Sequence, residues 1–236
     1  MADRRDKLRA IAVVPAYNET EAISAAIAEI RANAPMVDIV VVDDGSTDDT
    51  ARKAKVAGVY VLRNPFNMGI GATVQTGFKF AVAKGYDAAI QVDGDGQHDP
   101  RYIPKMLEII GNGADVVSGS RFLEKEGFQS SFLRRIGIRF FELLYRILAG
   151  IRITDCTSGF RAFGPRALHC VAEMYPDDYP EPEVILMLHR MRLNFAEIPV
   201  AMRDRQGGVS SIRGFKPLHY MVKVTLALLM NKIRKV

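Results

Sequence analysis

The alternation of short apolar runs with helical patterns over the first hundred residues most constrains the fold of this chain. Four runs rich in Val, Ile and Ala have the length and composition of buried strands: Ala10–Val14, Ile39–Val42, Val59–Leu62 and Ala88–Val92. Between them, apolar residues recur at the helical period, as in Ile23, Ile27 and Ile30. Because strands that alternate with helices through short loops form right-handed crossovers, the pattern predicts an α/β fold with a mostly parallel central sheet flanked by helices.

The starts of these helices carry local signals. Asn18–Glu21 has the form of a capping box, so we expect the first helix to begin there. Ser46–Asp49 places acidic residues at the start of the second helix, where the helix dipole favours them. Val74, Phe78 and Ala81 mark the apolar face of the third helix.

Beyond residue 100 the pattern continues, and no linker divides the chain. The expected elements are the helix Tyr102–Ile110, the strand Asp115–Ser118, the basic helix Ser131–Ala149, the helices Pro165–Met174 and Pro182–Met191, the strand Phe195–Val200 and a last helical stretch, Pro217–Ile233. A chain of 236 residues, 48% hydrophobic and 25% charged, suits one globular domain and excludes a disordered protein.

The cysteines and the apolar runs bear on the compartment. Cys156 and Cys170 are too few for a disulfide framework or a four-cysteine zinc site, which favours a reducing compartment. Met1–Arg9 is charged, unlike a signal peptide, and no run of 18 apolar residues predicts a membrane span. We therefore expect a cytoplasmic protein.

Charge is distributed unevenly along the chain. The net charge of +5 divides into −3 over residues 1–100 and +8 over residues 101–236. The second part therefore either meets an anionic partner, such as a phosphate group or a membrane surface, or presents an ordinary solvated basic face.

Polar side chains follow three of the predicted strands. The first strand leads into Pro15–Glu19, the second into Asp43–Ser46 and the fourth into Asp93–His98. Such residues can merely cap helices. However, the carboxyl ends of parallel strands meet at one edge of the sheet, where ligands bind in open α/β folds. Several carboxylates gathered there predict a bound cation or polar ligand groups, since like charges would otherwise raise one another's pKa.

Asp93 and Asp95 form the sharpest pair. Residues two apart at the end of a strand project to the same side, and the intervening Gly94 lets a phosphate group approach the backbone. With the amide of Gln97, these carboxylates suit Mg²⁺ or Mn²⁺ whose shell is completed by diphosphate oxygens. His98 is expected to support this motif from behind or to cap the backbone rather than to ligate the metal.

Two other nucleotide sites are excluded by inspection. A dinucleotide site requires GxGxxG after the first strand, where Pro15–Glu19 has no glycine, and no GxxxxGK[ST] phosphate loop occurs. Nucleotidyl transfer stays as a distant alternative, although the glycine-rich basic loop that it requires after the first strand is also missing.

Several motifs together resemble a known family. Val14–Glu19, Val41–Ser46, Asn67–Ala72, Asp93–His98 and Gly119–Arg121 stand in the order and spacing of family 2 glycosyltransferases. Thr154–Arg161 resembles the signature of the branch that contains dolichol-phosphate mannose synthases and polyprenyl-phosphate sugar transferases. The similarity runs from about Ile11 to Ser211, most of the chain.

The resemblance implies a GT-A fold, a nucleoside-diphosphate sugar donor, a divalent metal and inversion at the anomeric carbon. It implies one domain, with residues 1–120 binding the donor, 121–212 binding the acceptor and 213–236 forming an amphipathic helix. The implied donor-binding residues are Pro15, Tyr17, Asn18, Glu19, Asp43, Asp44, Gly69, Asp93, Gly94, Asp95, Arg205, Ser210 and Ser211, with Asp93, Asp95 and Gln97 around Mg²⁺ or Mn²⁺ and Arg121 facing phosphate.

The chain departs from the mannose-synthase pattern in three places, one of which is the segment Tyr179–Glu183. Ser211 stands where that branch has a lysine in its late Gly-x-Ser-Lys motif, which leaves the donor open, although Arg213 offers a charge nearby. The hydrophobic membrane-spanning tail of many members is also missing.

The acceptor decides whether a base is required. The resemblance favours polyprenyl phosphate, such as dolichyl or undecaprenyl phosphate, whose anionic oxygen attacks unaided. The alternative is a hydroxyl of a growing polysaccharide or glycolipid, which needs a carboxylate to take its proton. Asp155 is then the leading base candidate, followed by Glu181 and Glu183, which could instead complement a helix dipole.

A membrane-bound acceptor makes contact with a bilayer plausible. The helix Ser131–Ala149 combines Arg134, Arg135, Arg139 and Arg146 with large apolar residues, among them Phe132, Ile136, Phe140, Phe141, Leu144, Ile147 and Leu148. It is either a packed helix or a basic amphipathic helix on the cytoplasmic face of an anionic membrane. The last helical stretch could do likewise, or bury its apolar face in a homodimer or against a small membrane-protein partner; no nucleic-acid partner is expected.

Overall fold

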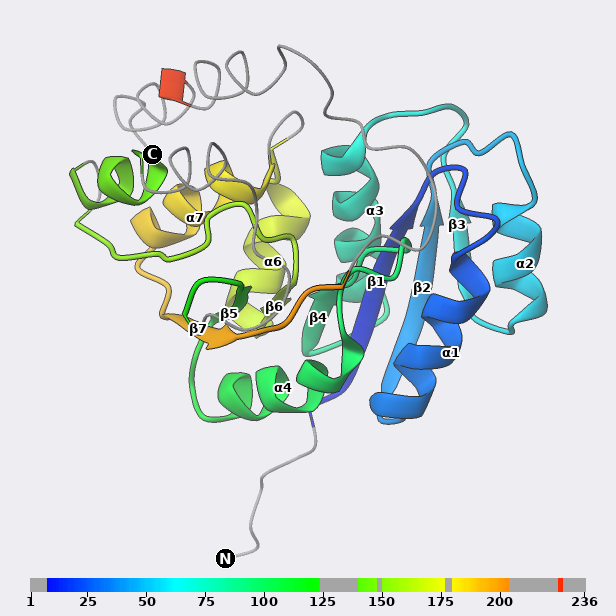
Figure 1. Ribbon diagram of the computed structural model, residues 1–236, viewed down its shortest axis with the longest axis horizontal. Helices are drawn as coiled ribbons and strands as arrows, with labels where there is room; N and C mark the ends of the chain where they lie inside the picture. The colour runs from blue at the N-terminus through cyan, green and yellow to red at the C-terminus, as the bar shows by residue number, and fades with distance from the viewer. Residues whose placement is uncertain (1–7, 124–139, 148–149, 177–179, 204–224, 227–236) are drawn as a thin grey trace, which may run out of the picture.

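The computed structural model describes residues 8–123, 140–147, 150–176, 180–203 and 225–226. Its centre is a sheet with the strand order β3-β2-β1-β4-β6-β5-β7 (Figure 1). The strands are β1 Ala10–Ala16, β2 Val37–Asp43, β3 Tyr60–Arg63, β4 Ala88–Gln91, β5 Val116–Ser120, β6 Arg161–Phe163 and β7 Phe195–Pro199. All pairs are parallel except those of β6, which runs antiparallel to β4 and to β5.

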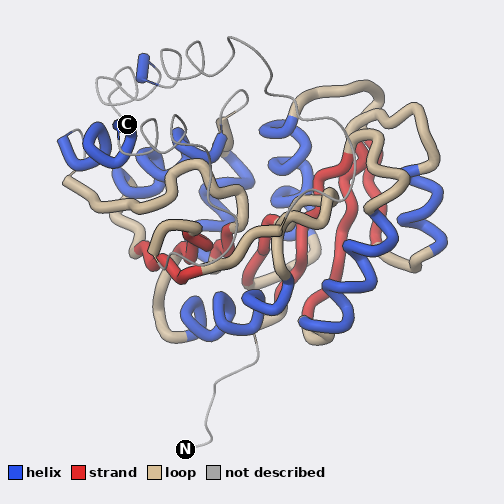
Figure 2. The backbone as a smooth tube through the Cα atoms, viewed as in Figure 1, coloured by secondary structure: helices blue, strands red, loops and turns tan. Residues whose placement is uncertain are grey.

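Helices cover both faces of this sheet (Figure 2). They are α1 Ile23–Asn33, α2 Thr50–Val56, α3 Ile70–Ala83, α4 Ile103–Gly111 after a short 3₁₀ turn, α6 Pro165–Glu173 and α7 Pro180–Arg190. A further helical segment covers 140–147. Side chains of α1, α2 and α4 pack on one face of the sheet, and those of α3, α6 and α7 on the other.

Strand β1 shows how the sequence builds this three-layer arrangement. Ala12 and Val14 pack into the core on the α1 side, whereas Ile11 and Val13 point to the α3 side. Successive side chains of a strand point to opposite faces, so a strand covered on both faces is apolar throughout. Helix α3 lies so close to β1 that a Cβ at Gly77 would overlap the Val13 side chain.

Most predicted elements are confirmed, within a few residues at their ends. Helix α2 begins at Thr50 rather than at Ser46, so the prediction of acidic residues in its first turn is wrong. Strand β6 was not predicted, and it makes the sheet mixed rather than purely parallel. The predicted start of α1 is wrong: the helix begins at Ile23, without a side-chain cap, because Asn18 and Thr20 bond to the loop after β2.

Two predictions extend beyond the described residues. The predicted helix Ser131–Ala149 is described only at 140–147, which is helical, and Pro217–Ile233 only at 225–226. Within the described part of the chain, no helix is long and apolar enough to cross a bilayer.

Candidate active site

The predicted motifs meet at one edge of the sheet, where β1, β2, β4 and β5 end. Strand β6 runs in the opposite direction, so the segment that leads into it, residues 154–160, joins the same edge. The edge therefore collects five loops that are far apart in the sequence.

The loops after β1 and β2 are locked together by main-chain donors. The N–H of Asn18 donates to Ser46 Oγ at 2.9 Å, and Asn18 Oδ1 accepts from the N–H of Thr47 at 2.9 Å. Asn18 has a left-handed backbone, with φ of 54°, which Asn tolerates better than most residues. The preceding Tyr17 is 46% exposed, so its ring is accessible at the mouth of the site.

The two aspartates after β2 have different surroundings. Asp44 accepts hydrogen bonds from Asn64 Nδ2 and from the N–H groups of Met68 and Gly69, at 2.8–3.0 Å, and so holds the loop before α3. Asp43 is fully buried, accepts from the N–H of Ser46 and lies 3.1 Å from Arg63 Nε. The oxygens of Asp44 are thus occupied by the loop before α3.

The Asp93–Gln97 segment forms a tight turn. Asp95 is 5% exposed and accepts from the N–H of Gln97 at 3.0 Å, while the Asp93 side chain is 34% exposed. Gly96 takes a φ of 78°, which favours glycine. A Cβ at Gly94 would lie 3.1 Å from the carbonyl oxygen of Pro15, so this glycine allows the turn to approach β1.

His98 supports the turn from behind. Its Nδ1 accepts from the N–H of Asp93 at 3.0 Å, and its ring stacks on Phe160 with centroids 4.9 Å apart. Burial lowers the pKa of His98 to about 4, so the ring is neutral at physiological pH. The expected backbone-capping role is therefore what the structure shows.

The donor set of the turn fits a hard cation. Among the described residues, no cluster of three or more His, Cys, Asp or Glu side chains could enclose a metal ion. Mg²⁺ is commonly held by one or two carboxylates together with substrate phosphates and water, and Asp93 and Asp95 supply two. The residues present thus suit a site that the substrate completes.

Arg121 and Asp155 form a buried, two-pronged ion pair. Arg121 Nε and Nη2 donate to the two Asp155 oxygens at 2.7 and 2.8 Å, and the N–H of Arg121 donates at 3.2 Å. Asp155 also accepts from the N–H and the hydroxyl of Thr157. Its side chain is 0% exposed and that of Arg121 is 12% exposed. Five donors thus surround the carboxylate that the sequence favours as a base.

A second buried arginine stands beside this pair. Arg161, 1% exposed, donates to the carbonyl oxygens of Cys156 and Glu181 at 3.0 and 2.6 Å. Cys156 packs in a hydrophobic cluster, and burial raises the pKa of its thiol to about 12.

Glu181 and Glu183 lie in the first turn of α7 and are partly buried. Burial raises the pKa of Glu181; the charge of Asp93 adds to this effect and that of Arg161 opposes it. Both glutamates can complement the dipole of α7, and Glu181 also lies within electrostatic range of the Asp93 turn.

The segment after β7 is tied back to this turn. The N–H of Arg203 donates to the carbonyl oxygen of Gln97 at 3.1 Å, and its guanidinium binds both carboxylate oxygens of Glu29 on α1 at 2.9 and 2.7 Å. Arg203 Nη2 lies 3.3 Å from Asp99 Oδ2. The predicted residues Arg205, Ser210 and Ser211 lie outside the described residues.

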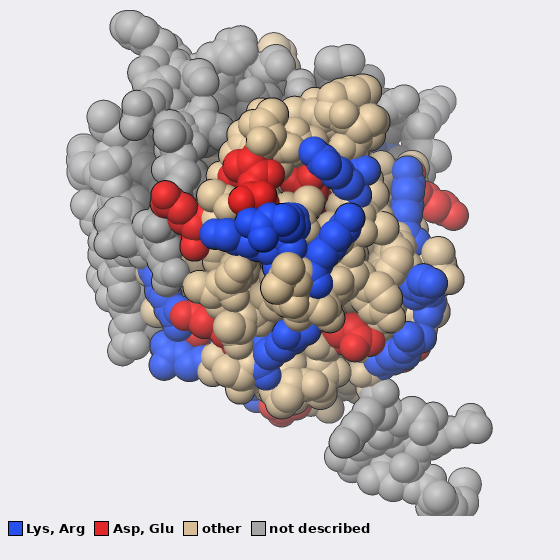
Figure 3. Space-filling view, turned by 90° about the vertical axis from the view of Figure 1, so that its right-hand side faces the viewer, with Lys and Arg blue, Asp and Glu red and all other residues tan. Residues whose placement is uncertain are grey.

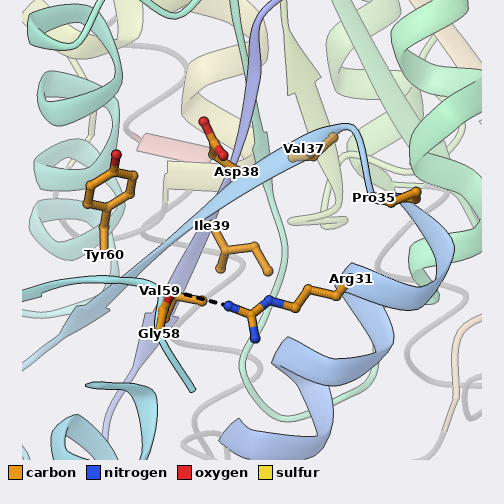
Figure 4. A pocket seen from close by; sticks show the side chains of 8 residues that line it. All are labelled: Arg31, Pro35, Val37, Asp38, Ile39, Gly58, Val59 and Tyr60. Atoms are coloured by element: carbon orange, nitrogen blue, oxygen red, sulfur yellow. Dashed lines mark hydrogen bonds between the residues drawn. The ribbon is translucent and has the colours of Figure 1, made fainter. Parts of the chain in front are cut away.

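Two other surface features lie away from the motifs. A hollow of about 610 Å³ opens at the amino ends of β2 and β3 (Figure 4), lined by Arg31, Pro35, Val37, Asp38, Ile39, Gly58, Val59 and Tyr60. Its charged groups serve the fold, since Arg31 donates to the carbonyl oxygen of Gly58 and Asp38 accepts from the Tyr86 hydroxyl. On the face that carries α2, acidic and basic side chains are interspersed (Figure 3).

Comparison with known proteins decides the family. The family described as Glycosyl transferase family 2 matches residues 11–172, which carry every motif from β1 to α6. The chain belongs to this family. This family 2 enzyme is therefore a glycosyltransferase, and the nucleotidyl-transfer alternative is set aside.

The sequence relatives of the family 2 enzyme include lipid-phosphate sugar transferases. It is 30% identical over 216 residues to the undecaprenyl-phosphate mannosyltransferase of Micrococcus luteus, covering 88% of each chain. It is 30% identical to the UDP-N-acetylglucosamine–dolichyl-phosphate N-acetylglucosaminyltransferase of Methanococcus voltae, covering 80% of this chain and 83% of that protein.

A solved structure supports the fold. Glucosyl-3-phosphoglycerate synthase from Mycobacterium tuberculosis, in complex with Mn²⁺, UDP-glucose and phosphoglyceric acid, superposes with a TM-score of 0.74 at 21% identity. The match covers 97% of the family 2 enzyme and 81% of that chain. The expected GT-A architecture is therefore confirmed.

The sequence did not single out Glu197, on β7. Its carboxylate accepts from the N–H groups of Thr154 and Asp155, next to the Arg121 ion pair. The sequence did contain one signal for this role, an acidic residue in the middle of the apolar strand Phe195–Pro199. Burying a carboxylate in such a strand costs stability unless the carboxylate has hydrogen-bond partners.

Proposed function

We propose that this enzyme transfers a sugar, with inversion, from a nucleoside-diphosphate sugar to polyprenyl phosphate. The observation that carries this proposal is the saturation of Asp155 by Arg121 and Thr157. Two guanidinium bonds and three further hydrogen bonds fill the roughly four lone-pair directions of this carboxylate, so no position on it is left to receive a substrate hydroxyl. A phosphate oxygen is already anionic at neutral pH and needs no base, whereas a hydroxyl does. The names of the relatives point to the same acceptor class.

For the nucleoside, we infer a site at the ends of β1 and β2. Tyr17 offers an accessible ring, Pro15 and Glu19 are its near neighbours in the chain, and Asp43 is paired with the adjacent Ala16 across β1 and β2. Of the two predicted aspartates, Asp43 is the better candidate, because the Asp44 oxygens hold Met68 and Gly69. Asn18 and Gly69 then shape the loops rather than read the base.

For the diphosphate, we infer that Asp93, Asp95 and Gln97 hold Mg²⁺ or Mn²⁺. Such a cation, when bound, offsets the charge on the departing diphosphate as a Lewis acid. The fork of Arg121, fixed by Asp155, supplies positive charge in a buried setting, where it stabilises developing negative charge most effectively. Arg205, Ser210 and Ser211 remain proposed phosphate contacts.

One observation favours a second candidate, transfer to a hydroxyl of a polysaccharide or glycolipid. Burial raises the pKa of Glu181, and a raised carboxyl pKa is typical of a general base. In that reaction Glu181 or Glu183, rather than Asp155, would take the proton.

We also propose peripheral contact with an anionic membrane on its cytoplasmic face. At 140–147 the helical segment exposes Phe140, Leu143 and Ile147, at 40%, 56% and 66%. Its opposite side buries Phe141 and Tyr145 in the core. Apolar side chains spaced three and four apart form one face of a helix, as in helices that lie on a bilayer. Arg134, Arg135 and Arg139 lie outside the described residues.

A binding experiment tests the donor and the metal together. The unfolding temperature is measured with UDP-, GDP- and dTDP-sugars, each with and without Mn²⁺. A donor at one hundred times its Kd should add about 2.7 kcal/mol of stability, and only when Mn²⁺ is present. The proposal fails if no nucleotide sugar stabilises the protein under either condition.

A transfer experiment then tests the acceptor. The stabilising donor, radiolabelled in its sugar, is incubated with undecaprenyl phosphate or dolichyl phosphate in detergent. Label should move into the organic phase as a lipid-linked sugar with the mass expected for a sugar–polyprenyl phosphodiester. Transfer to a soluble glycan and not to either lipid would favour the hydroxyl acceptor instead.

A further inference from the structure

Glu197 lies behind the Arg121–Asp155 ion pair, on the strand next to β5. Its two oxygens accept from the N–H of Thr154 at 3.1 and 3.0 Å, and Oε1 accepts from the Thr154 hydroxyl at 3.1 Å. Oε1 also lies 3.3 Å from the N–H of Asp155, which donates to it. The Glu197 carboxylate thus holds the main chain at Thr154 and Asp155, and Asp155 is the ion-pair partner of Arg121.

The same segment is bonded to β5 on its other side. The Thr154 hydroxyl lies 2.6 Å from Ser120 Oγ, and Ser120 Oγ accepts from the N–H of Phe122 at 3.2 Å. Ser120 and Phe122 flank Arg121 in the chain. Both backbones that carry the ion pair are therefore held through Thr154, and Thr154 is held by Glu197.

This arrangement is unfavourable for a carboxylate by itself. Burial raises the pKa of Glu197, and the charge of Asp155 adds to the rise, while the hydrogen bonds from Thr154 and Asp155 oppose it. Arg121 is the cation of the pair, and it is bonded to Asp155 rather than to Glu197. A group kept in a costly setting next to a reactive centre is expected to have a functional reason.

We propose that Glu197 is a positioning residue, which sets the direction of the Arg121 guanidinium by holding Thr154 and Asp155. The inference rests on the proposed function, in which Arg121 faces the phosphate groups of the substrates. Misdirecting a fixed charge by a fraction of an ångström weakens its effect in the transition state more than in substrate binding.

The first test is the kinetics of Glu197→Gln, which keeps the shape and one acceptor oxygen but removes the charge. Hydrogen bonds to a charged acceptor are about twice as strong as neutral ones. We expect kcat to fall about 5- to 30-fold, with the donor KM changed less than about 3-fold. In an Arg121→Ala background, the same substitution should have no further effect on kcat.

Asp115→Asn is the matched control. Asp115 is also a buried carboxylate that accepts from a main-chain N–H, that of Asn194 at 2.8 Å, but it precedes β5 at the opposite edge of the sheet. Its variant should lose stability and keep kcat. The proposal would be overturned if Glu197→Gln and Asp115→Asn lost kcat equally, or if the effects of Glu197→Gln and Arg121→Ala on kcat were fully additive. Glu197 would then be only a cap of the 154–157 turn.

The pH profile is the second test. The ionised form of Glu197 holds Thr154, so kcat should fall as pH decreases through a carboxyl pKa above the ordinary value. This acid limb should disappear in Glu197→Gln and persist in Glu181→Gln. Persistence of the limb in Glu197→Gln would contradict the inference.

A third measurement needs no turnover. The ¹⁵N NMR signal of Arg121 Nε, identified by its absence in Arg121→Lys, reports the order of the guanidinium. It should shift or broaden in Glu197→Gln and stay unchanged in Asp115→Asn; an unchanged signal in both variants overturns the inference. If wild-type protein turns over no nucleotide sugar, the proposed function fails, and this measurement still decides the role of Glu197.

Discussion

Replacing Asp155 by Asn separates its two candidate roles most sharply. The substitution keeps the volume of the side chain and removes the charge that pairs with Arg121. Breaking a fully buried ion pair costs about 3–5 kcal/mol, because the remaining charge stays desolvated. Here Arg121 is 12% exposed and Thr157 can still bond to the amide oxygen, so we expect a loss of about 2–3 kcal/mol.

Urea unfolding measures this loss. With an m-value of about 2–3 kcal/mol/M for a protein of this size, the midpoint should fall by about 1 M. The double variant Asp155→Asn with Arg121→Gln removes both charges and should be more stable than Asp155→Asn alone. A single variant within about 0.5 kcal/mol of wild type would refute the energetic reasoning.

Transfer to undecaprenyl phosphate measures the catalytic role of Asp155. As a positioning residue for Arg121, Asp155 should contribute about tenfold to kcat, equivalent to about 1.4 kcal/mol. As a general base it would contribute about 10²–10⁴-fold. A loss of more than about a hundredfold with this anionic acceptor would show that Asp155 does more than hold Arg121.

Four further predictions concern other parts of the molecule. Asp93→Asn and Asp95→Asn should each abolish Mn²⁺-dependent donor binding, measured by calorimetry, while circular dichroism shows an unchanged fold; metal-dependent binding at wild-type affinity would remove these residues from the metal site. Gly77→Ala should lower the unfolding free energy by about 1–3 kcal/mol, because its methyl group overlaps a β1 side chain; an unchanged urea midpoint would contradict this packing. His98 has a pKa of about 4 in the folded protein, below its unfolded value of 6.5, so its contribution to stability is complete above pH 6.5 and decreases as pH falls toward 4. His98→Asn should remove this part of the pH dependence of urea unfolding. An unaltered pH dependence would assign the effect to another group. Arg203→Met should weaken Mn²⁺-dependent donor binding by loosening the Gln97 turn, whereas Arg31→Met, at the opposite edge of the sheet, should leave donor binding unchanged. Equal effects of the two variants on donor binding would count against a link between Arg203 and the turn.

Features that depend on local pattern were predictable from the sequence. A strand covered on both faces must be apolar throughout, and a helix must carry its apolar residues three and four apart, so β1, β2, β4, α1 and α3 follow from composition and period alone. Parallel strands end at one edge, so the meeting of the Asp43 and Asp93 motifs also followed from the order of elements.

The start of α1 shows where local reasoning fails. Asn18–Glu21 has the residues of a capping box, but the side chain of Asn18 and the N–H of Thr20 bond to residues 47 and 48 of the next loop. A partner 28 or more residues away competes with the local cap, and a sequence window does not contain it.

Strand β6 and the surroundings of Asp155 could be decided only by the tertiary structure. Strand β6 has three residues and no period of its own; it exists because β4 and β5 offer unpaired edges on both sides of it. Arg121 meets Asp155 across 34 residues, and Glu197 reaches Thr154 across 43. The sequence determined that the carboxylates of the Asp43 and Asp93 motifs stand at the site, because strand ends are local features. Whether a carboxylate there takes a proton or holds an arginine depends on which donors surround it, and those donors come from other strands.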